Sequence, residues 1–276
     1  MKVQCAICPH HCKLEEGQVG ICHGRMNQNN TIISKNYGKL TAIALDPIEK
    51  KPLYHFHPGS RILSIGSYGC NLRCPFCQNC DISMVKEAEA KVVQMECEDI
   101  IEKAILLKSA GNIGIAYTYN EPLIGYEFVR DMAKRAREHG LKNVVVTNGF
   151  ICEEPFRELL PLIDAFNIDL KGFTQSYYHK LRGDLATVKH SIEIAAKYCH
   201  VEVTTLIVPG ENDSEEEMDL LSAWVAGVCP DIPLHISRFF PRWKMHDRDA
   251  TPVKKIYELA EIARKHLKYV YEGNVW

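Results

Sequence analysis

Four cysteines lie within residues 69–80, in the segment GCNLRCPFCQNC: Cys70, Cys74, Cys77 and Cys80. Clustered cysteines of this kind are typical of metal sites in intracellular proteins, because disulfides are rare there. The set fits a structural zinc site closed by four ligands, or a four-cysteine iron–sulfur cluster that transfers electrons. It also fits a cluster held by three cysteines, whose open iron binds and activates another molecule, as the open position of catalytic zinc does.

A second group of four cysteines, C-x2-C-x3-C-x9-C, lies near the start of the chain: Cys5, Cys8, Cys12 and Cys22. Four thiolates can close a tetrahedral zinc site or hold a second iron–sulfur cluster. Zinc is slightly favoured, because nothing in the sequence demands a second redox centre. The spacing therefore predicts a metal site that mainly stabilises the N-terminal region.

Composition excludes several function classes. The 276 residues carry a formal net charge of −2, which gives no indication of nucleic acid or an anionic membrane surface as a partner. No apolar run approaches the ~18–20 residues that a membrane-spanning helix needs. The N-terminal residues MKVQCAICPHHCKLEEG lack the apolar stretch of a signal peptide. We therefore expect a cytoplasmic protein.

The elements that must position these cysteines follow a repeated pattern. Short Val/Ile-rich runs predict six strands, which alternate with helical patterns: residues 62–66, 113–118, 143–148, 165–170, 201–208 and 233–240. Six such βα units predict a parallel sheet, either an open doubly wound sheet or a partial barrel. Residues 1–60 are expected to form a separate cysteine-rich region with a β-hairpin within residues 31–45, and residues 61–276 the main domain.

The unusual motifs all fall at the predicted carboxyl ends of strands. GSYGCNLRC follows the first strand, and YNEP, TNGF, DLKG and VPGEND follow the next four in order. Ligands of parallel α/β folds bind at this end of the sheet. The sequence therefore predicts one ligand site, with the cysteines of residues 70–80 at its centre.

Cys70, Cys74 and Cys77, with the aromatic Phe76 before the last of them, resemble the signature of the radical S-adenosylmethionine (SAM) superfamily. The resemblance runs from this loop to the end of the chain and implies an α/β fold, a partial (β/α)6 barrel of the TIM type. It implies a [4Fe-4S] cluster on three cysteines, leaving Cys80 as a free thiol. SAM would chelate the open iron. An electron from a donor such as flavodoxin or ferredoxin would cleave it to a 5′-deoxyadenosyl radical, which abstracts hydrogen from a substrate.

The same resemblance implies a set of SAM-binding residues. YTYNEP is similar to a GGEP-type segment, although Tyr119 and Asn120 stand where the family has glycines. IDLKG and VPGEND resemble segments of the enzymes that activate glycyl radical enzymes, and TNGF resembles a ribose-binding segment. Simple turns, or a buried Lys–Asp pair, are the alternative interpretations. The implied cofactor-binding residues are Phe76, Glu121, Asn148, Asp169, Lys171 and Val208.

A narrower resemblance covers almost the whole chain. CxxCPHxC, DPIEKKPLYHF and SRFFPRWKM are similar to segments of the radical SAM enzymes of the AmmeMemoRadiSam system, relatives of pyruvate formate-lyase activating enzymes. AMMECR1-like and Memo-like proteins are then the implied partners. The N-terminal region and the bulky basic loop at residues 238–248 favour a small or medium-sized substrate. The alternatives are activation of a glycyl radical enzyme and, from another class, a non-catalytic iron–sulfur electron carrier.

Overall fold

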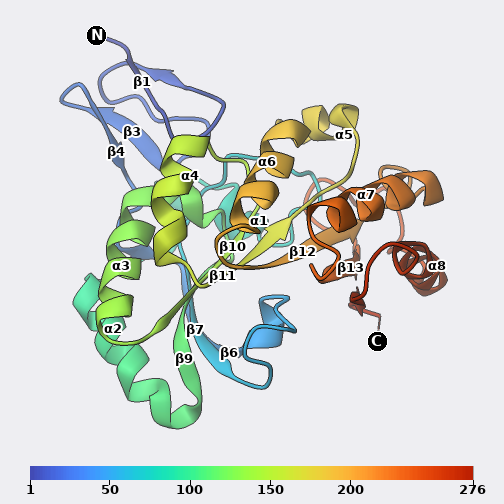
Figure 1. Ribbon diagram of the computed structural model, residues 1–276. Coiled ribbons are helices and arrows are strands. Elements are labelled where there is room, and N and C mark those ends of the chain that lie inside the picture. The colour runs from blue at the N-terminus through green and yellow to red at the C-terminus, as the bar shows by residue number, and fades with distance from the viewer. Residues whose placement is uncertain (276) are drawn as a thin grey trace.

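The computed structural model describes residues 1–275, and its centre is one curved sheet of eight strands (Figure 1). The strand order is β14-β13-β12-β11-β10-β9-β7-β6. Neighbouring strands from β7 to β14 are parallel, whereas β6 is antiparallel to β7. Within the described residues β6 and β14 do not pair with each other, so the barrel stays open. The strands are β6 (Ala42–Pro47), β7 (Arg61–Gly66), β9 (Asn112–Tyr117), β10 (Lys142–Thr147), β11 (Ala165–Asp169), β12 (His200–Ile207), β13 (Leu234–Arg238) and β14 (Val270–Gly273).

All six predicted strands are present, as β7 and β9 to β13, which confirms the α/β fold with a parallel sheet. Helices cover the outer face of the sheet (Figure 1). In α3, Tyr126, Val129, Ala133 and Ala136 are buried at the three- and four-residue spacing of a helix that packs with one face. The helices are α1 (Cys80–Ser83), α2 (Cys97–Leu106), α3 (Tyr126–Glu138), α4 (Glu153–Leu159), α5 (Gln175–Lys180), α6 (Leu185–Ala195), α7 (Glu215–Val228) and α8 (Val253–Ala263).

The N-terminal region forms small two-stranded sheets, and its strands β3 and β4 lie near one end of α3 (Figure 1). β1 (Val3–Gln4) pairs with β2 (Lys13–Leu14), β3 (Arg25–Gln28) with β4 (Thr31–Ser34), and β5 (Lys39–Leu40) with β8 (Val93–Gln94). The hairpin differs from the one expected within residues 31–45. Asn29 and Asn30 both have positive φ, which makes the tight turn between β3 and β4. Residues 42–47 instead join the main sheet as β6.

The segment that connects β6 to β7, residues 48–60, closes the lower end of the barrel, and we call it the plug segment (Figure 1). Its Ile48 and Leu53 are fully buried. They pack against the lower interior side chains of the strands, Ile62, Ala116, Val144 and Ala165. Successive side chains of a strand alternate between its two faces. Every second residue beyond this apolar layer therefore also points into the barrel.

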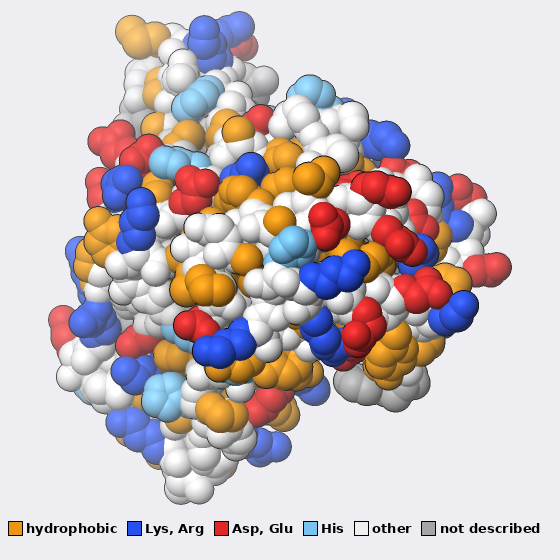
Figure 2. Space-filling model, turned by 45° about the vertical axis from the view of Figure 1, so that its right-hand side comes forward, with side chains coloured by type: hydrophobic (Ala, Val, Ile, Leu, Met, Phe, Trp, Pro, Cys, Tyr) orange, Lys and Arg blue, Asp and Glu red, His pale blue; other side chains and the backbone are white. Residues whose placement is uncertain are grey.

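The surface is of mixed charge. On the face shown in Figure 2, Lys and Arg side chains are interspersed with Asp and Glu rather than gathered in one area. This agrees with the nearly balanced composition of 33 basic and 35 acidic residues. Within residues 1–275, no helix combines the length and apolar character required to cross a membrane.

Candidate active site

A cavity of about 320 Å³ opens at the carboxyl ends of the central strands. Eight of the predicted residues line it: Cys70, Cys74, Phe76, Cys77, Glu121, Asn148, Asp169 and Lys171. They come from the loops that follow β7, β9, β10 and β11. Parallel strands bring these loops to one edge of the sheet, which is why residues 100 positions apart in the chain share one wall.

The cysteine loop, residues 67–80, is held in place by hydrogen bonds of its own backbone and by contacts with neighbouring segments. The amide of Cys77 donates to the carbonyl of Cys74 at 3.2 Å, and the amide of Arg73 donates to Leu181. The Leu72 amide donates to the sulfur of Cys70 at 3.4 Å. Burial raises the pKa of the Cys74 thiol to about 12 and also raises the pKa of Cys70 and Cys77. These thiols are therefore neutral unless a metal displaces their protons.

Cys80 differs from the other three cysteines of the loop. It begins α1, is buried, and its thiol donates to the Asp81 carboxylate at 3.5 Å. It is not among the residues that line the cavity. The donor set that faces the cavity thus consists of three thiols, which fits a cluster with one iron left without a protein ligand.

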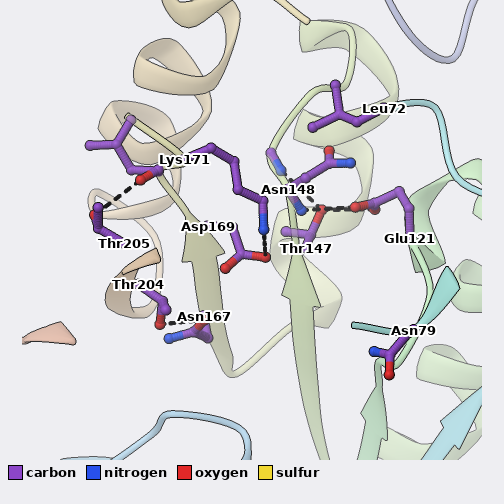
Figure 3. A network of polar contacts seen from close by, with 12 residues as sticks. Leu72, Asn79, Glu121, Thr147, Asn148, Asn167, Asp169, Lys171, Thr204 and Thr205 are labelled. Carbon is purple, nitrogen blue, oxygen red and sulfur yellow. Dashed lines mark hydrogen bonds and ion pairs between the residues drawn. The ribbon is translucent and has the colours of Figure 1, made fainter. Parts of the chain in front are cut away.

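Glu121 connects the ends of β9 and β10 (Figure 3). One carboxylate oxygen accepts hydrogen bonds from the Thr147 hydroxyl at 2.8 Å and the Leu123 amide at 2.9 Å. The other accepts from the Asn148 amide at 2.8 Å. Burial raises the pKa of Glu121 to about 7. The carboxyl group therefore fixes the local geometry of the cavity wall, and it is only partly ionised at neutral pH.

Asp169 and Lys171 form an ion pair at the end of β11, with 2.8 Å between the carboxylate oxygen and Nζ (Figure 3). Burial opposes the charge on Lys171, but Asp169 raises the lysine pKa above its ordinary value. The Lys–Asp pair considered from the sequence is thus present, partly buried, and both of its residues also line the cavity. The pair offers the cavity one carboxylate and one ammonium group close to each other.

Asn120 has a role that its sequence motif did not reveal. Its side chain donates to the carbonyls of Tyr68 and Gly69, at 3.3 and 3.0 Å, and accepts from the Ser67 amide at 2.9 Å. It thereby fastens the first turn of the cysteine loop to the end of β9. The only signal in the sequence was that Asn120 and Tyr119 replace two glycines.

The remaining predicted residues fall in different places. Phe76 lies on the cavity wall and its ring stacks at 6.5 Å on Tyr177. Val208 is fully buried, and its amide donates to the side chain of Asn212 at 2.7 Å. Val208 does not line the cavity, so the structure does not bring it together with the other predicted residues.

The basic loop at residues 238–248 packs on the cysteine loop. The Lys244 amide donates to the Pro75 carbonyl at 3.0 Å, and Gln78 donates to the Phe240 carbonyl at 3.0 Å. Arg242 forms an ion pair of 2.6 Å with Asp81. The loop therefore covers residues 75–81 from the side of β13.

The four N-terminal cysteines also gather next to the cysteine loop. A Cβ atom at Gly20 would stand 3.8 Å from the sulfurs of both Cys12 and Cys22, and Cys5, Cys8 and Cys22 are buried. The Cys22 carbonyl accepts from the Cys70 amide at 3.1 Å. Within residues 1–275, however, no three His, Cys, Asp or Glu side chains converge as a site for a single metal ion. The predicted zinc therefore has no support from this geometry.

Comparison with known proteins identifies the family. The model of the Radical SAM superfamily matches residues 64–221. Uncharacterized protein MJ0808 of Methanocaldococcus jannaschii is 42% identical over 99% of this chain and 82% of its own length. Pyruvate formate-lyase 1-activating enzyme of Escherichia coli is 25% identical over 58% of this chain, which spans 65% of that enzyme.

Solved structures show the same fold. A domain of pyruvate-formate lyase-activating enzyme from Bacteroides vulgatus matches 58% of this chain and 99% of its own, with a TM-score of 0.50 and 21% identity. Streptococcus suis SuiB bound to precursor peptide SuiA matches 83% of this chain and 52% of its own, with a TM-score of 0.60 and 14% identity. The family match covers more than half of the chain, including the cysteine loop and the strand ends that line the cavity. The chain therefore belongs to the Radical SAM superfamily, and this membership implies a [4Fe-4S] cluster and SAM.

Proposed function

We propose that this chain is a radical SAM enzyme that binds a [4Fe-4S] cluster through Cys70, Cys74 and Cys77 and acts on a small or medium-sized substrate. The observation that carries the proposal is the division among the four cysteines of the loop. Three of them line the cavity, and Cys80 does not. This favours a cluster with an open iron over the closed four-cysteine cluster of an electron carrier.

The cluster and SAM together would supply a 5′-deoxyadenosyl radical for hydrogen abstraction, while the protein orients the reactants and excludes water. Asp169 and Glu121 offer acceptors for the amino and hydroxyl groups of SAM, and Lys171 offers a positive charge for its carboxylate. Asn148 can both donate and accept. Its side-chain nitrogen also lies 3.7 Å from the Cys70 sulfur, so it would lie beside a ligand of the cluster.

Two segments beside the cavity support a small substrate. The plug segment fills the lower end of the barrel with Ile48 and Leu53, and the basic loop at residues 238–248 packs on the cysteine loop. A shielded radical avoids side reactions with water and protein. Activation of a glycyl radical enzyme is the second candidate, because activating enzymes are among the relatives of the chain.

Several further assignments belong to this proposal. The electron donor would be a flavodoxin or ferredoxin, and AMMECR1-like and Memo-like proteins are the proposed partners in a cytoplasmic AmmeMemoRadiSam system. We also retain a metal at the N-terminal cysteines, zinc or a second cluster. Burial raises the pKa of Cys8 to about 12, so a metal would be needed to keep this thiol deprotonated.

Anaerobic reconstitution with iron and sulfide, followed by a SAM cleavage assay with dithionite, tests the function. We expect 5′-deoxyadenosine and methionine as products, and an EPR spectrum of the reduced cluster that changes when SAM is added. A variant with alanine at Cys70, Cys74 and Cys77 is the negative control. An iron-loaded wild-type protein that neither cleaves SAM nor changes its spectrum would contradict the proposal.

A further inference from the structure

The lower part of the active-site cavity carries positive charge from the plug segment, residues 48–60. Lys50 and Lys51, in the motif DPIEKKPLYHF, line the same cavity as the three cysteines. Both belong to the plug segment, which enters the barrel from below. Tyr119, which stands in place of a family glycine, lines the cavity beside them.

Lys51 is held in a defined place. Its side chain is 4% exposed, and Nζ donates to the Asp46 carboxylate at 2.9 Å. The Tyr119 hydroxyl donates to the same oxygen at 2.6 Å, and the Lys51 ammonium lies 4.5 Å from the centre of the Tyr119 ring. The Tyr119 backbone has a positive φ of 70°, and its ring packs over Gly66, where a Cβ atom would approach it to 2.8 Å.

The charges of Lys50, Lys51 and Asp46 do not cancel, and we call these three residues the charged group. Lys50 lies 3.6 Å from the second oxygen of Asp46, so two ammonium groups share one carboxylate. Burial opposes ionisation of Asp46, but hydrogen bonds from Tyr119 and Lys51 lower its pKa to about 2, so the carboxylate is charged at neutral pH. Asp46 itself does not line the cavity, whereas both lysines do. The cavity therefore meets a net positive charge.

Lys51 also has unused hydrogen-bonding capacity. An ammonium group has three donors. Within residues 1–275 its one hydrogen bond goes to Asp46, and the Tyr119 ring covers another side. A buried charge with donors left over is unfavourable unless a further acceptor meets it. An anionic ligand in the cavity would supply that acceptor.

This charged group begins below the end of the cavity proposed to bind SAM, and Tyr119 reaches from one to the other, because its hydroxyl donates to Asp46 while its ring packs over Gly66. β6 is antiparallel to β7, and Asp46 lies opposite Ile62, whereas the cysteine loop starts after Gly66. Four residues of a strand correspond to about 13 Å. A ligand anchored at Lys51 would therefore reach from the lower end of the cavity up toward the cysteines, which is the position that a substrate needs.

We propose that Lys51, assisted by Lys50, binds an anionic group of the substrate, a carboxylate or a phosphate. The identification of this ligand as the substrate rests on the proposed function, whereas the anion site itself does not. If the Lys51–Asp46 pair served only to fasten the plug segment, neither a second lysine nor a position on the cavity wall would be needed.

Isothermal titration calorimetry tests the site on the reconstituted full chain with saturating SAM and no reductant. The probes are inorganic phosphate and succinate, and the preferred probe identifies the chemical class. We expect one site per chain, with at least a tenfold weaker affinity in Lys51→Met and wild-type-like binding in Lys51→Arg. Lys254→Met, whose side chain is 87% exposed on α8, is the matched control and should bind as the wild type does.

The outcomes separate this inference from the proposed function. If the wild type cleaves SAM but neither probe binds, or Lys51→Met binds equally well, the anion site is refuted and the function stands. If the wild type does not cleave SAM but Lys51→Met weakens binding of the probe, the proposed function is refuted and the anion site stands. Should Lys51→Met fail to fold, Asp46→Asn/Lys51→Met removes both buried charges. In that case Lys50→Met becomes the deciding variant, because the Lys50 side chain is 68% exposed. If Lys50→Met binds the probes with unchanged affinity, the anion site is refuted.

Discussion

The amide of Cys70 donates a hydrogen bond to the carbonyl of Cys22, with 3.1 Å between the two atoms. The first cysteine of the barrel loop is thus held by the last cysteine of the N-terminal group. His10 strengthens this contact, because its ring nitrogen lies 2.8 Å from the carbonyl of Asn71. The N-terminal region therefore acts as a brace for the cysteine loop, and a disturbance at this contact should affect the barrel cluster.

Gly69→Ala should break this contact. Gly69 has a positive φ of 90°, and an added Cβ atom would approach the Cys22 carbonyl oxygen to 2.3 Å. We expect a loss of unfolding free energy beyond the ~1–2 kcal/mol of left-handed strain alone, and a lower iron content after reconstitution. Gly59→Ala is the matched control, because Gly59 has a φ of 79° and no atom within 4 Å of the new Cβ. Equal effects of the two variants would refute the brace.

The sequence predicted the central strands well because parallel strands are buried on both faces and carry continuous apolar runs. It did not predict β14, a short edge strand after the last helix, or the joining of residues 42–47 to the main sheet. Edge pairing depends on which strand end is left open once the barrel has curved, and this is not encoded in local periodicity. The hairpin was misplaced because its turn lies earlier, at Asn29 and Asn30, and because residues 42–47 pair with β7 instead.

The cysteine loop provides a prediction about ligand number. Alanine at Cys70, Cys74 or Cys77 should abolish the EPR response of the reduced protein to SAM, because each thiol lines the cavity. Cys80→Ala should retain that response and SAM cleavage. Cys80 is as buried as Cys74, each at 7% exposure, so the comparison controls for the loss of a buried thiol. Loss of the cluster in Cys80→Ala alone would favour the four-cysteine electron carrier.

Metal analysis of a variant with alanine at Cys70, Cys74 and Cys77 isolates the N-terminal group. We expect metal to remain bound, and chelation to lower the melting temperature, since metal binding by a folded site contributes to folding free energy. Residual zinc would support a structural role, whereas residual iron with acid-labile sulfide would indicate a second cluster. A variant that also has alanine at Cys5, Cys8, Cys12 and Cys22 is the control. Equal metal content in the two variants would exclude this site.

The polar residues of the site were predicted only where they follow the strands directly. Glu121, Asn148, Asp169 and Lys171 stand at strand ends, so topology alone brings them to one edge. Lys51 lies in the plug segment between β6 and β7, and its position depends on how this segment packs against the strands. Sequence patterns carry no information about that tertiary contact.

Glu202 fastens the plug segment from β12 and makes it sensitive to acid. Its buried carboxylate accepts from the amides of Tyr54 and His55, at 3.0 and 2.8 Å. It also pairs with His200 at 2.9 Å and His235 at 2.6 Å. Burial alone would raise the pKa of Glu202, but these partners lower it to about 2, from 4.5 for an unperturbed glutamate. The folded state thus favours the ionised form.

Glu202→Gln tests this contact. A depressed pKa gives stability that is present above the unfolded value of 4.5 and is lost as the pH falls toward 2. A difference of one pKa unit corresponds to 1.36 kcal/mol, so the charge contributes on the order of 3 kcal/mol to the free energy of unfolding at pH 7. Guanidinium unfolding should therefore show a wild type more stable than the variant at pH 7, with the difference shrinking between pH 4.5 and 2. The exposed Glu216→Gln on α7 should show no such pH dependence.

The last prediction concerns the choice between a small substrate and a partner protein. An enzyme that activates a glycyl radical enzyme must admit a backbone loop of its partner to the radical. Here the plug segment fills the lower end of the barrel and Lys244 and Phe240 hold the basic loop against the cysteine loop. Incubation of the reduced protein with SAM and glycyl radical enzymes of the same source should therefore yield no glycyl radical doublet by EPR. Pyruvate formate-lyase with its Escherichia coli activating enzyme serves as the positive control. A doublet on the partner, formed with matching consumption of SAM, would replace the small-substrate proposal with activation of that partner.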